Sequence, residues 1–396
     1  MKFNVIDSIE SQILRPERDL PYVFVGRRRE LRGLENHFNV ISNRSHGSSG
    51  LLLVSGIPGI GKTQLIEKFA REKEESGEAL WLRLHTEDLT DSRVLTLLRT
   101  ALRLRQSGLR WTDVEVSLLG LKTNIARDLK YEDLTSGLDQ LVQSKHKQPI
   151  IVSIDEIQNL QQTQADILRK FHTGTPDLPI LVVCAGLQNS YAVLQQHGLS
   201  RLGEIFEIDL LDQSDCETAI RQMLEVWGVD VDGTGQDSLE LRVQGLAGSS
   251  QGFPCHLQSH LSALKAVILE RGKNFGTEDD WHQVNGIAKH KRNEYYSGRI
   301  EALGFPNAGV VMHRIAKLLN ERKDASFNTA SSADIIKILN SAEEDGMVDI
   351  DKGKALVRMV ETGCLKVEEY SFYSIPIPSF QQYLLSRVDP YTKTVR

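Results

Sequence analysis

A three-layer α/β/α domain with a parallel sheet, followed by an all-helical region and a C-terminal winged-helix domain, is the fold class that the sequence predicts. Three observations lead to it. Short apolar runs alternate with helix-period segments as far as Leu211. Helices alone follow, and the chain then ends in two short helices and an alternating, hairpin-like ribbon. We therefore predict an N-terminal segment, a sheet domain, a helical lid and a winged helix at residues 1–22, 23–211, 212–300 and 301–396.

Length and composition indicate a globular protein with more than one domain. The chain has 396 residues, of which 40% are apolar and 25% charged, and its uncharged apolar runs are far shorter than a membrane span. The first residues, MKFNVIDSIESQIL, show neither a secretory signal nor a transit peptide, so we expect a cytoplasmic protein without membrane contact. The net charge of −6 argues against wholesale coating of nucleic acid. Four scattered cysteines indicate neither a disulfide framework nor a zinc cluster.

The stretch GIPGIGKT, residues 56–63, has the spacing of a phosphate-binding loop. The apolar run GLLLVS precedes it and the helix-period segment TQLIEKFAREKEE follows it, so a strand, a loop and a helix come in the required order. Glycine permits positive φ, which lets successive N–H groups converge on phosphates at the amino end of the helix. Lys62 would reach the β- and γ-phosphates, and the Thr63 hydroxyl would bind Mg2+. The loop residues expected to bind nucleotide are Gly56, Ile57, Pro58, Gly59, Ile60, Gly61, Lys62, Thr63 and Gln64.

A phosphate-binding loop needs a second, acidic site to hold the metal, and such a site also argues against a chance match of the loop spacing. Residues 149–160 read PIIVSIDEIQNL, an apolar strand with two carboxylates at its carboxyl end. Asp155 would hold Mg2+ through water, and Glu156 would orient and deprotonate the attacking water. An acidic helix cap after a strand is the alternative reading of Asp155 and Glu156. Together the two motifs predict ATP and Mg2+ as cofactors.

The two motifs resemble the Walker A and Walker B motifs of AAA+ ATPases. In addition, VFVGRRREL at residues 23–31 resembles the box that precedes these motifs in origin-recognition and STAND-type members. In that family the box wraps the adenine and the ribose, which makes Val25, Gly26 and Arg27 the expected contacts on the base side. The resemblance spans roughly residues 23–257. A basic turn that leads into the next helix is the alternative reading of the box.

Two later segments extend the resemblance. PILVVCAGLQNS is similar to the strand that ends in the polar residue called sensor 1, and both Gln188 and Asn189 are candidates for that residue. HGLSRLGEIFEIDLL is similar to the segment whose arginine can reach a γ-phosphate, and Arg201 is that residue here. A guanidinium offers planar, permanent positive charge to phosphate oxygens. A surface arginine at a helix end is the alternative reading of Arg201.

The helical lid opens at SDCETAIRQMLEVWG, where Ser214 and Glu217 predict a capping box. Farther along, GSSQGFPCHLQ resembles the G-x-P turn of STAND ATPases, in which the proline packs on the nucleotide, and Pro254 takes that place. A plain loop with a proline at the first helical position is the alternative. Many AAA+ proteins carry a sensor 2 arginine in the helix after this turn, and the sequence has none there.

The C-terminal region predicts a winged helix from ADIIKILNSAEEDG, KGKALVRMVETG and the ribbon CLKVEEYSFYSIPIP. Its second helix would be the recognition element, and it carries Lys352, Lys354 and Arg358 beside acidic residues. DNA contact through this helix and docking of a protein partner both remain open.

A nucleotide-dependent switch is the function that these features favour, with Mg2+-assisted attack of water on ATP as its chemistry. Such an AAA+ ATPase would act on or recruit a macromolecular partner, a protein or DNA, as in transposition, replication or defence. The alternative is a STAND-like sensor that holds nucleotide with little turnover and signals through protein partners. If the chain forms a homo-oligomer on ATP, Arg201 would act on a neighbouring subunit, whereas in a monomer it would act within its own chain.

Overall fold

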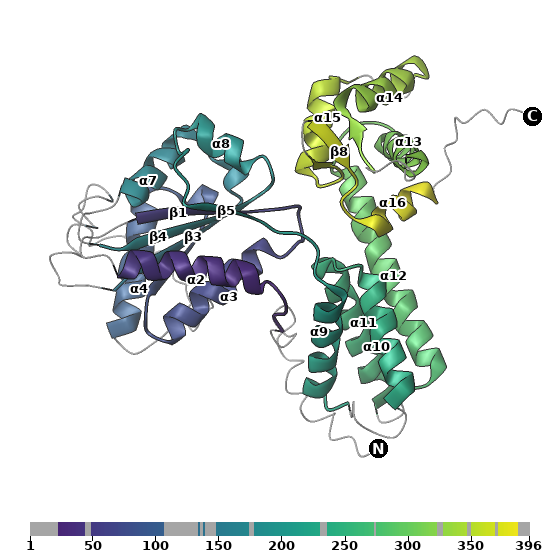
Figure 1. Ribbon diagram of the computed structural model, residues 1–396, viewed down its shortest axis with the longest axis horizontal. Coiled ribbons are helices and arrows are strands. Elements are labelled where there is room, and N and C mark those ends of the chain that lie inside the picture. The colour runs from purple at the N-terminus through teal and green to yellow at the C-terminus, as the bar shows by residue number, and fades with distance from the viewer. Residues whose placement is uncertain are drawn as a thin grey trace, which may run out of the picture. The chain divides into compact units, whose positions relative to one another are not determined.

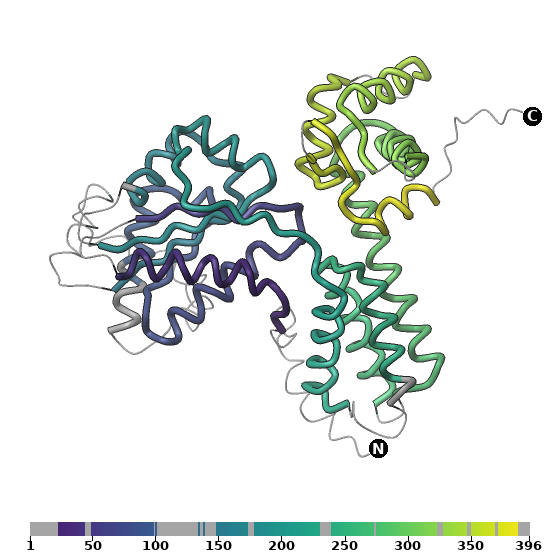
Figure 2. The backbone as a smooth tube through the Cα atoms, in the orientation of Figure 1, coloured from purple at the N-terminus to yellow at the C-terminus, as the bar shows by residue number. Residues whose placement is uncertain are grey.

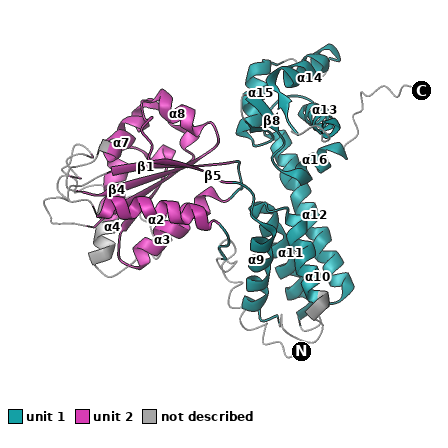
Figure 3. Cartoon of the chain, viewed as in Figure 1, with its two compact units in different colours: residues 1–26, 57–60, 209–396 teal, residues 27–56, 61–208 magenta. Residues whose placement is uncertain are grey.

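The computed structural model describes most of the chain, and its backbone is traced in Figure 2. The chain divides into two compact units (Figure 3). Unit 2 comprises Arg27–Gly56 and Gly61–Ile208, and unit 1 comprises Met1–Gly26, Ile57–Ile60 and Asp209–Arg396. The described residues are Leu134, Leu138 and the ranges 23–43, 49–106, 148–173, 178–229, 236–272, 275–322, 328–346, 350–368 and 371–386.

Unit 2 is built on a parallel sheet of five strands in the order β2-β3-β4-β1-β5. The central strands read as nearly continuous apolar runs, because helices cover both faces of a parallel sheet. Leu51 on β1 lies opposite Val182 on β4, and this register places Ser55 opposite Gly186 at the carboxyl edge. The strands are β1 (Ser49–Ser55), β2 (Leu80–His85), β3 (Ile150–Asp155), β4 (Ile180–Gly186) and β5 (Glu204–Glu207).

Helices form a layer on each face of this sheet (Figure 1). Leu51 and Leu53 of β1 belong to the core that α4, α7 and α8 cover, whereas the alternating Leu52 and Val54 face the opposite layer of α2 and α3. In that second layer the rings of Phe38 and Phe69 meet edge to face. The helical elements are α2 (Arg28–Ser42), α3 (Lys62–Glu75), η1 (Thr86–Asp88), α4 (Asp91–Gln106), η4 (Ile157–Asn159), α7 (Gln162–Thr173) and α8 (Ser190–Gln196).

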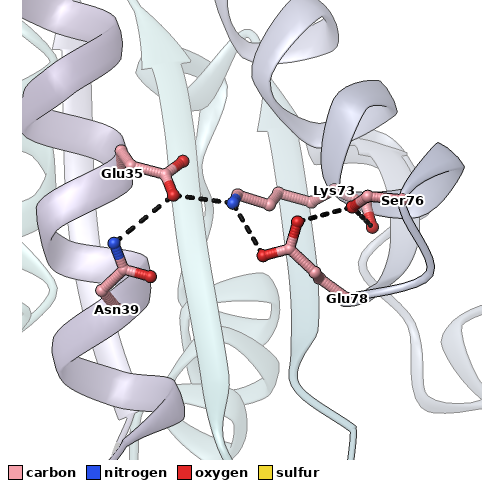
Figure 4. Close-up of polar contacts among 5 residues, drawn as sticks. All are labelled: Glu35, Asn39, Lys73, Ser76 and Glu78. Carbon is pink, nitrogen blue, oxygen red and sulfur yellow. Dashed lines mark hydrogen bonds and ion pairs between the residues drawn. The ribbon is translucent and has the colours of Figure 1, made fainter.

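A buried lysine fastens the two helices of the second layer to the start of β2 (Figure 4). The Nζ atom of Lys73 lies 2.7 Å from Glu35 Oε1 on α2 and 2.9 Å from Glu78 Oε2. Burial opposes the charge on Lys73, but these hydrogen bonds outweigh it and raise the pKa above its ordinary value. The hydroxyl of Ser76 and the ammonium of Lys73 both lower the pKa of Glu78. This cluster is therefore a charged structural link at the amino edge of the sheet.

Unit 1 contains a four-helix lid around its own apolar core, which includes Trp227 and Trp281. A capping box opens the last of these helices, since Asp280 N–H donates to Thr277 Oγ1 and Thr277 N–H donates to Asp280 Oδ2. The predicted capping box at Ser214 is wrong, because the first lid helix begins at Gln213 and Ser214 already lies in its first turn. The lid helices are α9 (Gln213–Val226), α10 (Gln236–Ser250), α11 (Pro254–Arg271) and α12 (Glu278–Glu301).

The last part of unit 1 is a winged helix with a three-stranded antiparallel sheet in the order β6-β8-β7. Ser331 and Asp334 cap the helix that begins at Ser332, and Arg322 donates to Asp334 Oδ2 at 2.9 Å. This hydrogen bond holds the pKa of Asp334 well below its ordinary value. The elements are α13 (Ala308–Glu321), β6 (Ala330–Ser331), α14 (Ser332–Glu344), α15 (Lys352–Glu361), β7 (Lys366–Val367), β8 (Phe372–Ser374) and α16 (Pro378–Leu385).

The predicted fold class is confirmed, since a parallel α/β core is followed by helices and then by a small antiparallel sheet. The four predicted domain boundaries stay predictions, and residues 1–22 lie outside the described part of the chain. None of the helices within the described ranges combines the length and the apolar character that a bilayer crossing needs.

Candidate nucleotide-binding site

The glycine-spaced loop has the backbone that phosphate binding requires. Gly59 and Gly61 have φ values of +81° and +97°, a region that other residues rarely adopt. Gly61 caps the amino end of α3, which begins at Lys62 and runs for 14 residues. The first N–H groups of such a helix have no partner within it and carry a partial positive charge. The loop and helix together therefore offer backbone donors to an anion.

Lys62 and Gly56 tie the two ends of the loop together. The Nζ atom of Lys62 donates to Gly56 O at 3.0 Å, which places the ammonium over the loop. Gly56 N–H in turn donates to Gly186 O at 3.3 Å, so the start of the loop is fixed to the end of β4. The lysine is thus held close to the position that a bound phosphate chain would take.

Thr63 and Asp155 meet at the carboxyl edge of the sheet. The Oγ1 atom of Thr63 donates to Asp155 Oδ2 at 2.7 Å, and Glu156 N–H donates to Asp155 Oδ1 at 2.9 Å. The main chain of Asp155 is also held, because Thr86 Oγ1 donates to its carbonyl at 2.7 Å. Two motifs that lie 92 residues apart in the sequence are joined here by one hydrogen bond.

The donor set at this point fits Mg2+. A hydroxyl and a carboxylate are hard oxygen ligands, and Mg2+ is usually held by one or two protein oxygens together with waters and substrate phosphates. Clusters of three or more His, Cys, Asp or Glu side chains with metal-binding geometry are absent from the described residues. Thr63 and Asp155 are the residues that would hold the ion beside a nucleotide.

Glu156 has a left-handed backbone, with φ +59° and ψ +38°. This conformation is uncommon for a residue with a side chain and costs roughly 1–3 kcal/mol. Glu156 lies between β3 and η4 with its side chain exposed, and Gln158 Nε2 donates to its Oε2 atom. A strained and exposed carboxylate next to Asp155 suits a group that handles water.

The sensor 1 candidates lie in the turn after β4. Leu187 N–H donates to Gln158 Oε1 at 3.2 Å, which links this turn to the one after β3. The Oδ1 atom of Asn189 is buried without a hydrogen-bond partner in the described structure. An orphan acceptor of this kind calls for a donor, and a water molecule fits that need. The geometry favours Asn189 over Gln188 for the role.

Arg201 lies at the opposite edge of the sheet. It precedes β5. Gly203, which lies directly before this strand, donates its N–H to Leu51 O near the start of β1. Its side chain is exposed, and its charge adds to burial in lowering the pKa of His172 at the end of α7. Strand β1 has seven residues, which at about 3.3 Å each separates the two edges by roughly 20 Å. Within unit 2, therefore, Arg201 is not brought to Lys62.

The residues expected on the base side belong to both units. Val25 and Gly26 lie in unit 1, where Val25 packs against the lid core and a Cβ atom at Gly26 would come within 2.5 Å of Asp215 Oδ2. Arg27 lies in unit 2 and caps α2 in a left-handed conformation with φ +58°. The structure thus explains Gly26 by close packing and leaves contact with the base as a prediction.

The G-x-P turn is tightly built within unit 1. A Cβ atom at Gly252 would lie 2.2 Å from Leu211 O, and Pro254 is the first residue of α11. The loop segment Ile57–Ile60 belongs to the same unit, and a Cβ atom at Gly59 would lie 3.0 Å from Phe253 Cζ. The turn that contains Pro254 is therefore brought to the tip of the phosphate-binding loop.

Two residues of α12 also reach this tip, and sequence reasoning missed both. Arg299 Nη2 and Tyr295 Oη donate to Pro58 O at 2.7 and 3.3 Å. Burial, above all, raises the pKa of Tyr295 to about 12, so its hydroxyl stays a donor at neutral pH. The only available signal is their helical spacing of four residues, which many helices share.

Comparison with known proteins identifies a family for residues 23–183. The AAA ATPase domain family matches residues 23–183, which therefore form an AAA ATPase domain. Comparison with curated proteins gives no match. The chain is similar to the ORC2 protein of Aeropyrum pernix in its ADP form, at 14% identity and a TM-score of 0.56 over 96% of each chain. The ADPNP–ADP complexes of that protein match at 13% identity and a TM-score of 0.55, over 93% of this chain and 95% of that one. At these identities the likeness establishes the fold.

Proposed function

We propose that the chain is an ATP-binding and ATP-hydrolysing AAA+ switch that acts on or recruits a macromolecular partner. The observation that carries this proposal is the hydrogen bond of 2.7 Å between Thr63 and Asp155. It joins the two motifs that an ATPase needs at one edge of the sheet, with Lys62 and Glu156 beside them. The AAA ATPase domain at residues 23–183 supports nucleotide binding at this edge.

Each side chain at this edge has a defined chemical role in the proposal. Lys62 and the N–H groups of the loop bind the phosphates, and Thr63 and Asp155 hold Mg2+, which would supply charge stabilisation to the phosphate oxygens. Glu156 orients the attacking water and takes its proton. Asn189 accepts a hydrogen bond from the same water.

The remaining site residues act at the periphery of the nucleotide. Val25, Gly26 and Arg27 would contact the base and the ribose, and Pro254 would pack on the nucleotide from the lid. Arg201 would supply positive charge to the γ-phosphate. Because Arg201 lies at the edge of the sheet opposite Lys62, we place this charge in the active site of a neighbouring subunit.

The partner could be DNA or a protein, and the charges of the winged helix favour a protein. On α15, Lys352 pairs with Glu343 at 2.5 Å, and Arg358 pairs with Glu361 at 3.3 Å. Arg358 Nε also donates to Ala302 O at 3.0 Å. These internal contacts would compete with DNA phosphates for the donors of Lys352 and Arg358, whereas Lys354 is 87% exposed and lies 3.9 Å from Asp351.

A STAND-like sensor that holds nucleotide with little turnover is the second candidate. The internal pairing on α15 favours it, since such a sensor signals through proteins. A further observation is that the loop tip and the lid are already bound together, with Arg299 Nη2 donating to Pro58 O. A loop held in this way would release nucleotide slowly.

Replacing Glu156 with glutamine tests the proposed hydrolysis. Glutamine keeps the size of the side chain and removes the base, so ATP affinity should change by less than about threefold while turnover falls by roughly 100-fold or more. Calorimetry with ATP and a phosphate-release assay measure the two quantities. The matched control is Glu87→Gln, because Glu87 is an exposed carboxylate that follows β2 at the same edge.

Two outcomes would change the assignment. Persisting hydrolysis in the Glu156 variant would move the role of the base to another residue. Tight ATP binding with negligible turnover in the unaltered protein would favour the STAND-like sensor over the hydrolysing switch.

A further inference from the structure

Arg299 on α12 joins two backbone segments that are far apart in the sequence, and all three lie in unit 1. Its Nη2 atom donates to Pro58 O at 2.7 Å, and its Nη1 atom donates to Gly363 O at 2.9 Å. Pro58 is at the tip of the phosphate-binding loop, and Gly363 is in the turn that ends α15 of the winged helix. The guanidinium fork therefore bridges the loop and the winged helix through their carbonyl groups.

Aromatic rings hold the guanidinium in place. Its central carbon lies 4.7 Å from the ring centre of Tyr295 and 5.7 Å from that of Phe253. Tyr295 Oη also donates to Pro58 O, at 3.3 Å, so this one carbonyl accepts from two side chains of the same helix. Planar stacking with a two-pronged donor is a use of arginine that lysine cannot reproduce.

Close packing adds a steric link between the same segments. Gly363 has φ +70°, and a Cβ atom there would lie 2.6 Å from Pro58 Cδ. At the neighbouring Gly59, a Cβ atom would lie 3.0 Å from both Phe253 Cζ and Tyr295 Oη. The loop tip and the turn thus fit together with no room for an added methyl group.

The charge of Arg299 is buried without a carboxylate. Arg299 is 6% exposed, and none of the ion pairs of the described residues involves it. Burying an unpaired guanidinium is costly, and only carbonyl dipoles and ring faces offset that cost here. A purely structural contact could use an apolar side chain at this position, so the charge points to a task that needs its hydrogen bonds.

The task follows from the geometry of the peptide unit. In a planar trans peptide the C=O and N–H groups point in opposite directions. By holding Pro58 O, Arg299 and Tyr295 direct the N–H of Gly59 away from the lid. That N–H is one of the loop donors available to a phosphate.

We propose that Arg299 is a positioning residue that sets the Pro58–Gly59 peptide for phosphate binding and, through Gly363, couples nucleotide binding to the docking of the winged helix. This inference rests on the proposed nucleotide-binding function. If the loop changes conformation when nucleotide binds or leaves, the hydrogen bond from Arg299 to Pro58 O changes. The hydrogen bond from Arg299 to Gly363 O, which holds the winged helix, then changes with it. By linkage, a partner that pulls the winged helix away changes nucleotide affinity by the same factor.

Hydrogen exchange of the nucleotide-free, full-length protein tests the bridge directly. In Arg299→Met, the amides of Ile57, Gly59 and Ile60 and those of residues 362–365 should both exchange about tenfold faster or more, because each segment loses a charge-assisted hydrogen bond. Exchange in α13 should stay unchanged. Arg299→Lys keeps the charge without the planar fork and should protect the two segments only in part.

Two further variants keep the test independent of a folding defect. Arg292→Gln is the matched control, because Arg292 lies on the same helix and donates to Ser249 O without reaching the loop. Gly363→Ala leaves Arg299 intact but pushes on Pro58 from the winged helix, so it should also speed exchange at residues 57–60. Faster exchange in only one of the two segments in Arg299→Met, or in neither, overturns the bridge.

Nucleotide titration separates this inference from the function on which it rests. ATP should slow exchange at residues 57–60 in both proteins, and it should change exchange at residues 362–365 in the unaltered protein only. An equal response of residues 362–365 in Arg299→Met overturns the coupling. Absence of ATP binding to the unaltered protein, measured by calorimetry, overturns the proposed function, whereas the nucleotide-free comparison still decides the bridge.

Discussion

The two edges of the five-stranded sheet use their polar side chains in different ways. At the carboxyl edge, Thr63 and Asp155 share one hydrogen bond, and Glu156 stands exposed beside them in a strained turn. At the amino edge, Lys73 is held between two carboxylates, those of Glu35 and Glu78, and is 8% exposed. The first group is the proposed nucleotide site, whereas in the second group the charges pair with one another.

Functional and structural charges can be told apart by whether the charged side chains pair with one another. Parallel strands all end at one edge, so side chains that follow them converge whether or not they contact one another. Ion pairs elsewhere need mutual contact to offset their desolvation. Arg201 is the exception at the amino edge, because its exposed charge has no carboxylate partner among the ion pairs of the described residues.

The largest effect is expected at the carboxyl edge, from Lys62→Ala. Loss of this cation should bring ATP binding below detection in calorimetry, because Lys62 lies over the loop and is the only cationic side chain within residues 56–63. Asp155→Ala should remove the dependence of binding on Mg2+. Lys68→Ala removes the same charge from the outer face of α3 and should bind ATP normally. Equal affinities of the Lys62 and Lys68 variants would disprove the site.

Arg201→Ala tests whether the amino edge also carries function. The variant should bind ATP normally and hydrolyse it on the order of a thousandfold more slowly, the effect of losing an arginine finger. Specific activity of the unaltered protein should rise with its concentration. Mixing the variant with Lys62→Ala should restore activity where an intact loop meets an intact arginine.

The outcome of that mixture decides between assembly and a monomer. Arg169→Ala is the control, since Arg169 is a half-buried arginine of α7 whose contacts include Asp166 and the carbonyl of His197. Circular dichroism of both variants checks the fold. A rate that is independent of concentration, with no rescue in the mixture, would favour a monomeric switch.

The smallest effect is expected from Lys73→Met, which should alter stability alone. Without the Lys73 ammonium, the carboxylates of Glu35 and Glu78 lie near each other unpaired, but their side chains are 41% and 49% exposed. The free energy of unfolding in urea should therefore fall by about 1–3 kcal/mol. ATP affinity should not change. Lys68→Met breaks an exposed pair on the same helix and should cost less than about 0.5 kcal/mol.

The pH dependence of the Lys73 cluster supplies its second readout. The pKa of Glu78 is lowered from its ordinary value of 4.5, so its contribution to stability is present above that pH and is lost as pH falls through the lowered value. As the pH falls from 5 toward acid unfolding, the unaltered protein should therefore lose more stability than Lys73→Met. Parallel stability curves for the two proteins would show that the cluster does not contribute.

Features that depend on residues close together along the chain could be predicted before the fold was known. Loop spacing from Gly56 to Thr63 specifies a strand, a turn and a helix, because glycine and the helix terminus act locally. Asp155 and Glu156 follow an apolar strand, and parallel strands end at one edge, so their convergence with the loop could be predicted. The fold class followed from the same local patterns.

Contacts between distant segments could be identified only from the folded chain. Arg299 and Gly363 reach Pro58 across more than 200 residues, and no local pattern marks a buried arginine that binds carbonyls. Helix α9 begins one residue before Ser214, because Asp212, with an extended backbone, takes the N-cap position. The edge at which Arg201 lies was likewise decided by the pairing of β5 with β1, a contact between strands about 150 residues apart.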